Sequence, residues 1–216
     1  MPAKEWFAPE QVEWLKVSER VLGEKGHFGE VRLGRLKFKG RKPFSVAVKQ
    51  FHPRHAFLFD WKKYEGAISS LRQAGVRMPK MALVEHGGRK VLVSELFASR
   101  GGSKIPDLRS VPEESKAAVL DTVAKIINAG YEPAPDAIGL VKTRKGFEPI
   151  VYDLDYPALE EKQSIVPSAQ DWLRRMYPAY KEGRVKALET LLAKVNHPVW
   201  RSELEKIRGK IGFRNE

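Results

Sequence analysis

The 216-residue sequence contains no cysteine, so it can form neither a disulfide nor a metal site with thiolate ligands. It also lacks any run of 18 apolar residues, which argues against a transmembrane helix. Its first residues do not include the apolar core of a signal peptide. Together these absences favour a cytoplasmic protein that makes no contact with a membrane.

Acidic residues are few relative to basic ones. The chain has 27 Asp and Glu against 39 Lys and Arg, a formal net charge of +12. Such a surplus allows an anionic partner, either an acidic protein or RNA. Because the basic residues are spread along the chain and no RNA-reading motif is present, a generally basic surface is the alternative interpretation.

The most informative pattern is a glycine-rich segment followed by a lysine in an apolar strand. Residues 22–31 read Leu-Gly-Glu-Lys-Gly-His-Phe-Gly-Glu-Val, and residues 46–50 read Val-Ala-Val-Lys-Gln. Glycines let backbone N–H groups approach phosphate oxygens, and a nearby lysine adds a positive charge. Together the two segments resemble the nucleotide-binding half of a protein kinase.

This resemblance implies that ATP is the bound nucleotide. The residues that would line its site in these segments are Gly23, Gly26, Gly29, Val31, Ala47 and Lys49. Lys49 would contact the α- and β-phosphates. The glycine pattern departs from that of kinases, because Glu24 occupies the position of the first glycine and Gly23 comes one residue early. The alternative is a twisted hairpin with a surface lysine.

A helix is expected over residues 60–74, ending at Gly75. Its apolar residues recur three and four positions apart: Trp61, Tyr64, Ile68 and Leu71. Within the resemblance, Glu65 matches the helix-αC glutamate that pairs with the strand lysine and orients it. Without that pairing it would be an ordinary solvated glutamate.

Two further strands are predicted at residues 81–85 and 90–95, joined by the turn His86-Gly87-Gly88-Arg89. By resemblance, the second leads into the hinge whose backbone binds the adenine edge, at about residues 95–98. Glu95 and Phe97 would lie in this hinge, with Ser94 as a small gatekeeper. Residues 99–103 read as a flexible linker between two lobes.

The catalytic loop is the part that departs most from kinases. A helix is expected from Val111 to Gly130. If residues 139–141 form the strand after the loop, Pro133 replaces the catalytic aspartate and cannot accept a proton. Glu132 or Asp136 could serve as a substitute base. Equally, both could be ordinary residues of a proline-rich turn.

A metal site is predicted directly after an apolar strand. Asp153 and Asp155 occur in Tyr-Asp-Leu-Asp-Tyr, which resembles the kinase Asp-Phe-Gly motif with Leu and Asp in place of Phe and Gly. Carboxylates at i and i+2 of an extended segment lie on one side, so both could bind one Mg²⁺. A solvated acidic turn is the alternative.

The sequence therefore predicts an α+β protein with a two-lobed protein-kinase-like fold. An antiparallel-sheet N-lobe would span residues 1–98, and a reduced helical C-lobe residues 99–216, with late helices at 181–195 and 202–207. The expected function is an atypical kinase that uses ATP and Mg²⁺, with a protein or small molecule as acceptor. The alternative is a pseudokinase that acts as a binding module, with RNA or a ribonucleoprotein as its candidate partner.

Overall fold

The chain divides into two compact units, which are described one at a time. The structure is a computed structural model that describes residues 9–22, 29–53, 60–96, 103–104, 113–133, 137–143, 146–152, 173 and 181–212. Unit 1 comprises residues 1–60 and 79–99, and unit 2 comprises residues 61–78 and 100–216. The helix of residues 61–73 thus groups with the C-terminal unit, although it precedes two strands of unit 1 along the chain.

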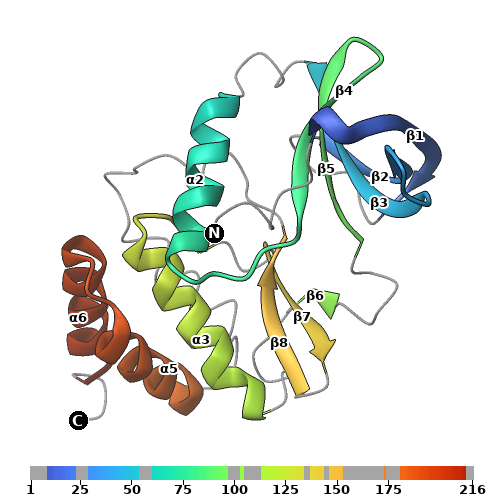
Figure 1. The fold of residues 1–216 in the computed structure, drawn as a ribbon. Coiled ribbons are helices and arrows are strands. Elements are labelled where there is room, and N and C mark those ends of the chain that lie inside the picture. The colour runs from blue at the N-terminus through green and yellow to red at the C-terminus, as the bar shows by residue number, and fades with distance from the viewer. Residues whose placement is uncertain are drawn as a thin grey trace. The chain divides into compact units, whose positions relative to one another are not determined.

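Unit 1 is built on a five-stranded antiparallel sheet in the order β1-β2-β3-β5-β4, which curls in Figure 1. A short 3₁₀ helix, η1 (Pro9–Gln11), precedes the first strand. The strands are β1 (Val12–Val21), β2 (Gly29–Phe38), β3 (Phe44–Phe51), β4 (Met81–His86) and β5 (Arg89–Glu95). The predicted hairpin of β4 and β5 is confirmed. Gly87 and Gly88 both have positive φ, as a tight two-residue turn requires.

One side of this sheet forms a continuous apolar core, here called the core face. Its buried residues come from all five strands: Leu15, Leu36, Phe38, Val46, Val48, Ala82, Val84, Val91 and Val93. Because strand side chains alternate between two faces, the residues between these positions lie on the opposite side. That opposite side carries Lys49, and it is called the Lys49 face below.

Within its described residues, unit 2 combines a small sheet with helices α2, α3, α5 and α6. The sheet has the order β6-β7-β8 and pairs β6 (Ser103–Lys104), β7 (Ile138–Thr143) and β8 (Gly146–Val151) in antiparallel fashion. The helices are α2 (Trp61–Gln73), α3 (Glu113–Asn128), α5 (Lys181–Lys194) and α6 (Pro198–Gly212). Helix α3 packs against β8 and α5, and α5 packs against α6.

Helices α2 and α3 end in the same way, at the glycines that the sequence predicted. Gly75 and Gly130 both have positive φ. After α2, Gly75 N–H donates to the Arg72 carbonyl and Val76 N–H to the Leu71 carbonyl. The equivalent pair of bonds after α3 runs from Gly130 to Ile127 and from Tyr131 to Ile126. These are Schellman caps, which satisfy carbonyls at the helix end and need a residue that tolerates positive φ.

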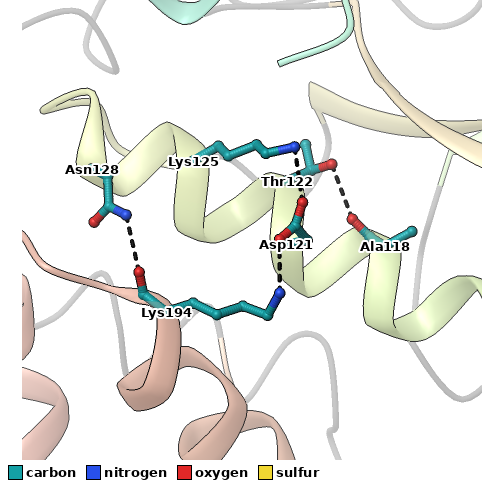
Figure 2. Close-up of polar contacts among 6 residues, drawn as sticks. All are labelled: Ala118, Asp121, Thr122, Lys125, Asn128 and Lys194. Carbon is teal, nitrogen blue, oxygen red and sulfur yellow. Dashed lines mark hydrogen bonds and ion pairs between the residues drawn. The ribbon is translucent and has the colours of Figure 1, made fainter. Parts of the chain in front are cut away.

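A polar network on α3 holds the end of α5, as Figure 2 shows, and also the segment that leads into α6. Asp121 accepts from Lys125 on its own helix and from Lys194 on α5, at 2.9 and 2.7 Å. The Asn128 side chain donates to the Lys194 carbonyl at 3.0 Å and accepts from Asn196 N–H at 2.8 Å. A single amide thus both caps α5 and holds the segment that leads into α6.

Replacing Asp121 by Asn is expected to lower stability by about 0.5–1 kcal/mol at neutral pH, since its ion pairs are screened by solvent at 38% side-chain exposure. The bond from Lys194 and then that from Lys125 hold the pKa of Asp121 below its usual value. A lowered folded-state pKa stabilises above the unfolded pKa, about 3.9, and the effect is lost as pH falls through the folded value. Urea unfolding of both proteins from pH 7 to 3 should therefore show a difference that shrinks below about pH 4. A difference independent of pH would contradict this account.

The predicted α+β class is confirmed, and three boundaries differ from expectation. Ser103, expected in a linker, pairs with Leu140 in the small sheet. The strand considered at residues 139–141 is part of the longer β7, which pairs with β8. The last helix begins at Pro198 rather than Ser202, because proline suits the first helical position. Within the described residues, no helix is long and apolar enough to cross a membrane.

Candidate functional site

Strand register gathers several of the predicted nucleotide-binding residues on the Lys49 face. Lys49 on β3 pairs with Val31 on β2 and with Leu92 on β5. Two residues earlier on β3, Ala47 pairs with Leu33 and Ser94. Directly paired residues, and residues two apart on one strand, point to the same side of a sheet. Val31, Ala47, Lys49 and the predicted gatekeeper Ser94 therefore share one face.

The part of the face around Lys49 is apolar. Val31, Leu33 and Ala47 are half-buried and Leu92 is buried, so the walls beside Lys49 are hydrocarbon. Lys49 is itself half-buried, and its Nζ lies 5.7 Å from the centroid of the Phe51 ring. An apolar surface suits the flat ring of a nucleobase, and a fixed ammonium at one end suits a phosphate. Sequence reasoning missed Leu33 and Leu92, although the alternation of the strands could have found them.

Gly29 is required by packing between strands. A Cβ at this position would lie 2.3 Å from the Gln50 carbonyl oxygen and 3.0 Å from Phe51 Cα. The glycine therefore lets β2 approach β3, whatever else it contributes to the loop before it. That loop joins β1 to β2, and Leu22 N–H donates to the Val31 carbonyl at its base. Gly23 and Gly26 lie outside the described residues.

Glu95 ties the end of β5 to the start of β4. Its backbone N–H donates to the Lys80 carbonyl at 2.8 Å, and its Oε2 accepts from Lys80 N–H at 3.0 Å. The carboxylate is thus engaged in closing the hairpin, while the Glu95 backbone pairs with Val46. Phe97, the second predicted hinge residue, lies outside the described residues.

Glu65 lies on the exposed side of α2. The buried side of this helix comprises Tyr64, Ala67, Ile68 and Leu71, as the predicted stripe requires, with Trp61 half-buried. Glu65 belongs to unit 2 and Lys49 to unit 1, so the predicted pairing between them stays a prediction. An exposed glutamate one position from the buried stripe is available for a partner charge.

In unit 2, the segment after α2 is hydrogen-bonded to β8, the strand that precedes the predicted metal motif. Val151 N–H donates to the Arg77 carbonyl at 2.9 Å, and the Arg77 guanidinium forms an ion pair with Glu148. Just beyond β8, Tyr152 N–H donates to the Ala137 carbonyl at 3.0 Å. Hydrogen bonds to the Arg77 and Ala137 carbonyls therefore hold the backbone of residues 151 and 152, directly before the Asp-Leu-Asp segment.

The predicted base and metal ligands are described only in part. Glu132 is half-buried in the short segment after the α3 cap, and Pro133 beside it is buried. Asp136, Asp153 and Asp155 lie outside the described residues. Within the part of the chain that the structure describes, no three acidic or histidine side chains are grouped closely enough to hold a metal ion.

No protein-family model matches this chain, and no curated protein is similar to it. The function must therefore be inferred from the residues themselves and from their arrangement. Val31, Ala47, Lys49 and Ser94 share one face, which the pairing of three strands defines.

Proposed function

We propose that the protein binds ATP with Mg²⁺ on the Lys49 face and is an atypical kinase of low turnover. The observation that carries the proposal is the position of Lys49 on the third strand, on one face with Val31 and Ala47. In protein kinases a lysine on the third strand pairs with the phosphates, and a glycine-rich loop covers them. The order of elements is consistent with that N-lobe, because a helix follows the third strand and two more strands then complete a five-stranded antiparallel sheet.

The roles of the remaining residues follow from this proposal. The apolar side chains Val31, Leu33 and Leu92 would contact the base and ribose, and Lys49 the phosphates. Glu65 would orient the lysine, as its counterpart does in kinases. Asp153 and Asp155 offer the carboxylate oxygens that Mg²⁺ prefers. Bound ATP would supply the γ-phosphoryl group, and the chain would position it for an acceptor that is a protein or a small molecule.

One observation favours a binding module as the second candidate. Pro133, at the position of the catalytic aspartate, is buried and cannot accept a proton. General-base assistance is worth about 10²–10⁴-fold in rate, so an enzyme without it should be slow. Turnover by a displaced carboxylate is expected well below the range of about 1–100 s⁻¹ that is typical of kinases.

A labelled-phosphate assay separates the two candidates. ATP hydrolysis or autophosphorylation would be measured for wild type, Glu132→Gln and Asp136→Asn. Of the two carboxylates, Asp136 is the better base, because Glu132 precedes a proline and is biased to extended geometry. A slow wild-type rate that Asp136→Asn cuts strongly supports the kinase. A rate of zero, or one identical in every variant, leaves the binding module.

Asp153→Asn is expected to weaken the Mg²⁺ dependence of ATP binding at least tenfold, because an amide oxygen carries no charge for the cation. Asp155→Asn should give a similar but smaller loss if both carboxylates share the ion. Calorimetric titration of ATP with and without Mg²⁺ measures both effects, and circular dichroism checks that each variant folds. Unchanged Mg²⁺ dependence in both variants would leave an ordinary acidic turn.

A further inference from the structure

The Lys49 face continues along β1 and β2 into a strongly basic surface. Lys37 and Arg35 follow Leu33 on the same side of β2. Their partners on β1 are Trp14, opposite Lys37, and Lys16, opposite Arg35. These four residues, with Lys39, Arg41 and Lys42 of the turn after β2, are called the basic hairpin. Between Val31 and Lys42 the chain has no carboxylate, and five of its six cations belong to the basic hairpin. The sixth, Arg32, is opposite Val48 on the core side and forms an ion pair with Glu30.

The pairing of Lys16 with Arg35 lowers the stability of the sheet when no anion is bound. Like charges directly opposite each other on antiparallel strands repel. Both side chains are exposed, and neither forms an ion pair with any residue that the structure describes. Lys37 is different, because Glu13 Oε1 lies 2.8 Å from its Nζ. A repulsive pair placed beside further cations is suited to a polyanion, which would neutralise it.

Trp14 adds an aromatic ring to these cations. It is half-buried on the edge strand, and Lys16 Nζ lies 5.3 Å from the centroid of its ring. The turn beyond β2 is fixed close by, since Lys39 N–H donates to the Gln11 carbonyl at 2.9 Å. Gly40 gives this turn its positive φ, and Lys39, Arg41 and Lys42 are all exposed around it.

We propose that the basic hairpin binds single-stranded nucleic acid. Spaced exposed cations can follow a phosphate backbone, and an aromatic ring among them can stack on a base. A duplex keeps its bases stacked on one another, so it could use the cations but not Trp14. An acidic peptide would likewise match the charge and leave the ring without a role. This binding surface is independent of nucleotide binding beside Lys49.

The test measures binding of fluorescein-labelled 12-nucleotide uridine and thymidine oligomers by fluorescence anisotropy at several salt concentrations. The double variant Lys16→Ala/Arg35→Ala should bind at least tenfold more weakly. Its slope of log K against log[salt] should fall by roughly 1.4, since each single-strand phosphate contact contributes about 0.7. Arg89→Ala/Lys90→Ala is the matched control, because it removes two exposed cations from the start of β5 in the same unit. It should leave affinity and slope nearly unchanged.

Two further readouts separate binding from folding. Trp14→Ala should weaken binding roughly tenfold, and Trp14→Phe should retain most of it, because phenylalanine still stacks. The Lys16→Ala/Arg35→Ala variant should melt at the same or a higher temperature, since it removes a repulsive pair. Equal losses in the hairpin and control variants would overturn the proposal. So would a twelve-residue polyglutamate, or a duplex of equal length, that competes as well as the single strand.

Discussion

Lys49→Ala is expected to weaken Mg²⁺–ATP binding at least tenfold, about 1.4 kcal/mol. The substitution removes the charge-assisted bond between the lysine ammonium and a phosphate. The residues opposite Lys49 and Ala47 on the neighbouring strands include no other cation. Titration calorimetry of both proteins measures the change. Lys49→Arg should lose less than Lys49→Ala but not match wild type, because a guanidinium carries the charge in a different shape.

Lys16→Ala is the matched control for this prediction. It also removes a lysine side chain from the Lys49 face, at a position on β1 that is opposite Arg35 and outside the apolar residues around Lys49. If a general positive potential attracts ATP, the two alanine variants should lose similar affinity. A specific phosphate contact requires a large loss for Lys49 and little for Lys16. Equal losses, or no binding by wild type at millimolar ATP, would contradict the assignment.

Gly29→Ala is expected to destabilise unit 1 by about 3 kcal/mol. The new methyl group would meet the Gln50 carbonyl oxygen, which is held in the ladder between β2 and β3 and cannot move without breaking it. Guanidinium unfolding monitored by circular dichroism gives the loss. Hydrogen exchange should show that the amides of β2 and β3 lose protection first.

Gly66→Ala is the control for that substitution and should have the opposite sign. Gly66 lies inside α2, and apart from its chain neighbours and its own helix backbone no described atom lies within 4 Å of the added Cβ, so alanine fits without a clash. It should stabilise by about 0.5–1 kcal/mol, because alanine costs less backbone entropy than glycine in a helix. A Gly29→Ala variant as stable as wild type would show that the β2–β3 contact relaxes easily.

Much of the fold could be predicted because its signals are local. The stripe on α2, the glycines that end α2 and α3, and the Gly87–Gly88 turn each depend on a few neighbouring residues. The apolar residues alone predict the last helix from Ser202, whereas α6 begins at Pro198 because proline suits the first helical position. The two residues of β6 carry no periodicity at all, so tertiary pairing alone defines them.

The candidate site was predictable in its residue types and not in its arrangement. The sequence indicates Val31, Ala47 and Lys49, but the register of β2, β3 and β5 is needed to place them on one face. The kinase resemblance explains Gly29 as a residue that lets the backbone approach a phosphate, whereas the packing of β2 against β3 already requires a glycine there. The amide of Asn128 joins segments 66 residues or more apart, which no local pattern reveals.

Methyl NMR during titration with Mg²⁺–ATP shows directly whether nucleotide binds on the Lys49 face. The sheet contains its own control, because Val31, Leu33 and Leu92 lie on the Lys49 face and Val46, Val48 and Val93 on the core face. Binding as proposed should shift the methyl signals of the first set strongly and those of the second set weakly. Absence of shifts at millimolar nucleotide, or the largest shifts on the core face, would contradict the account.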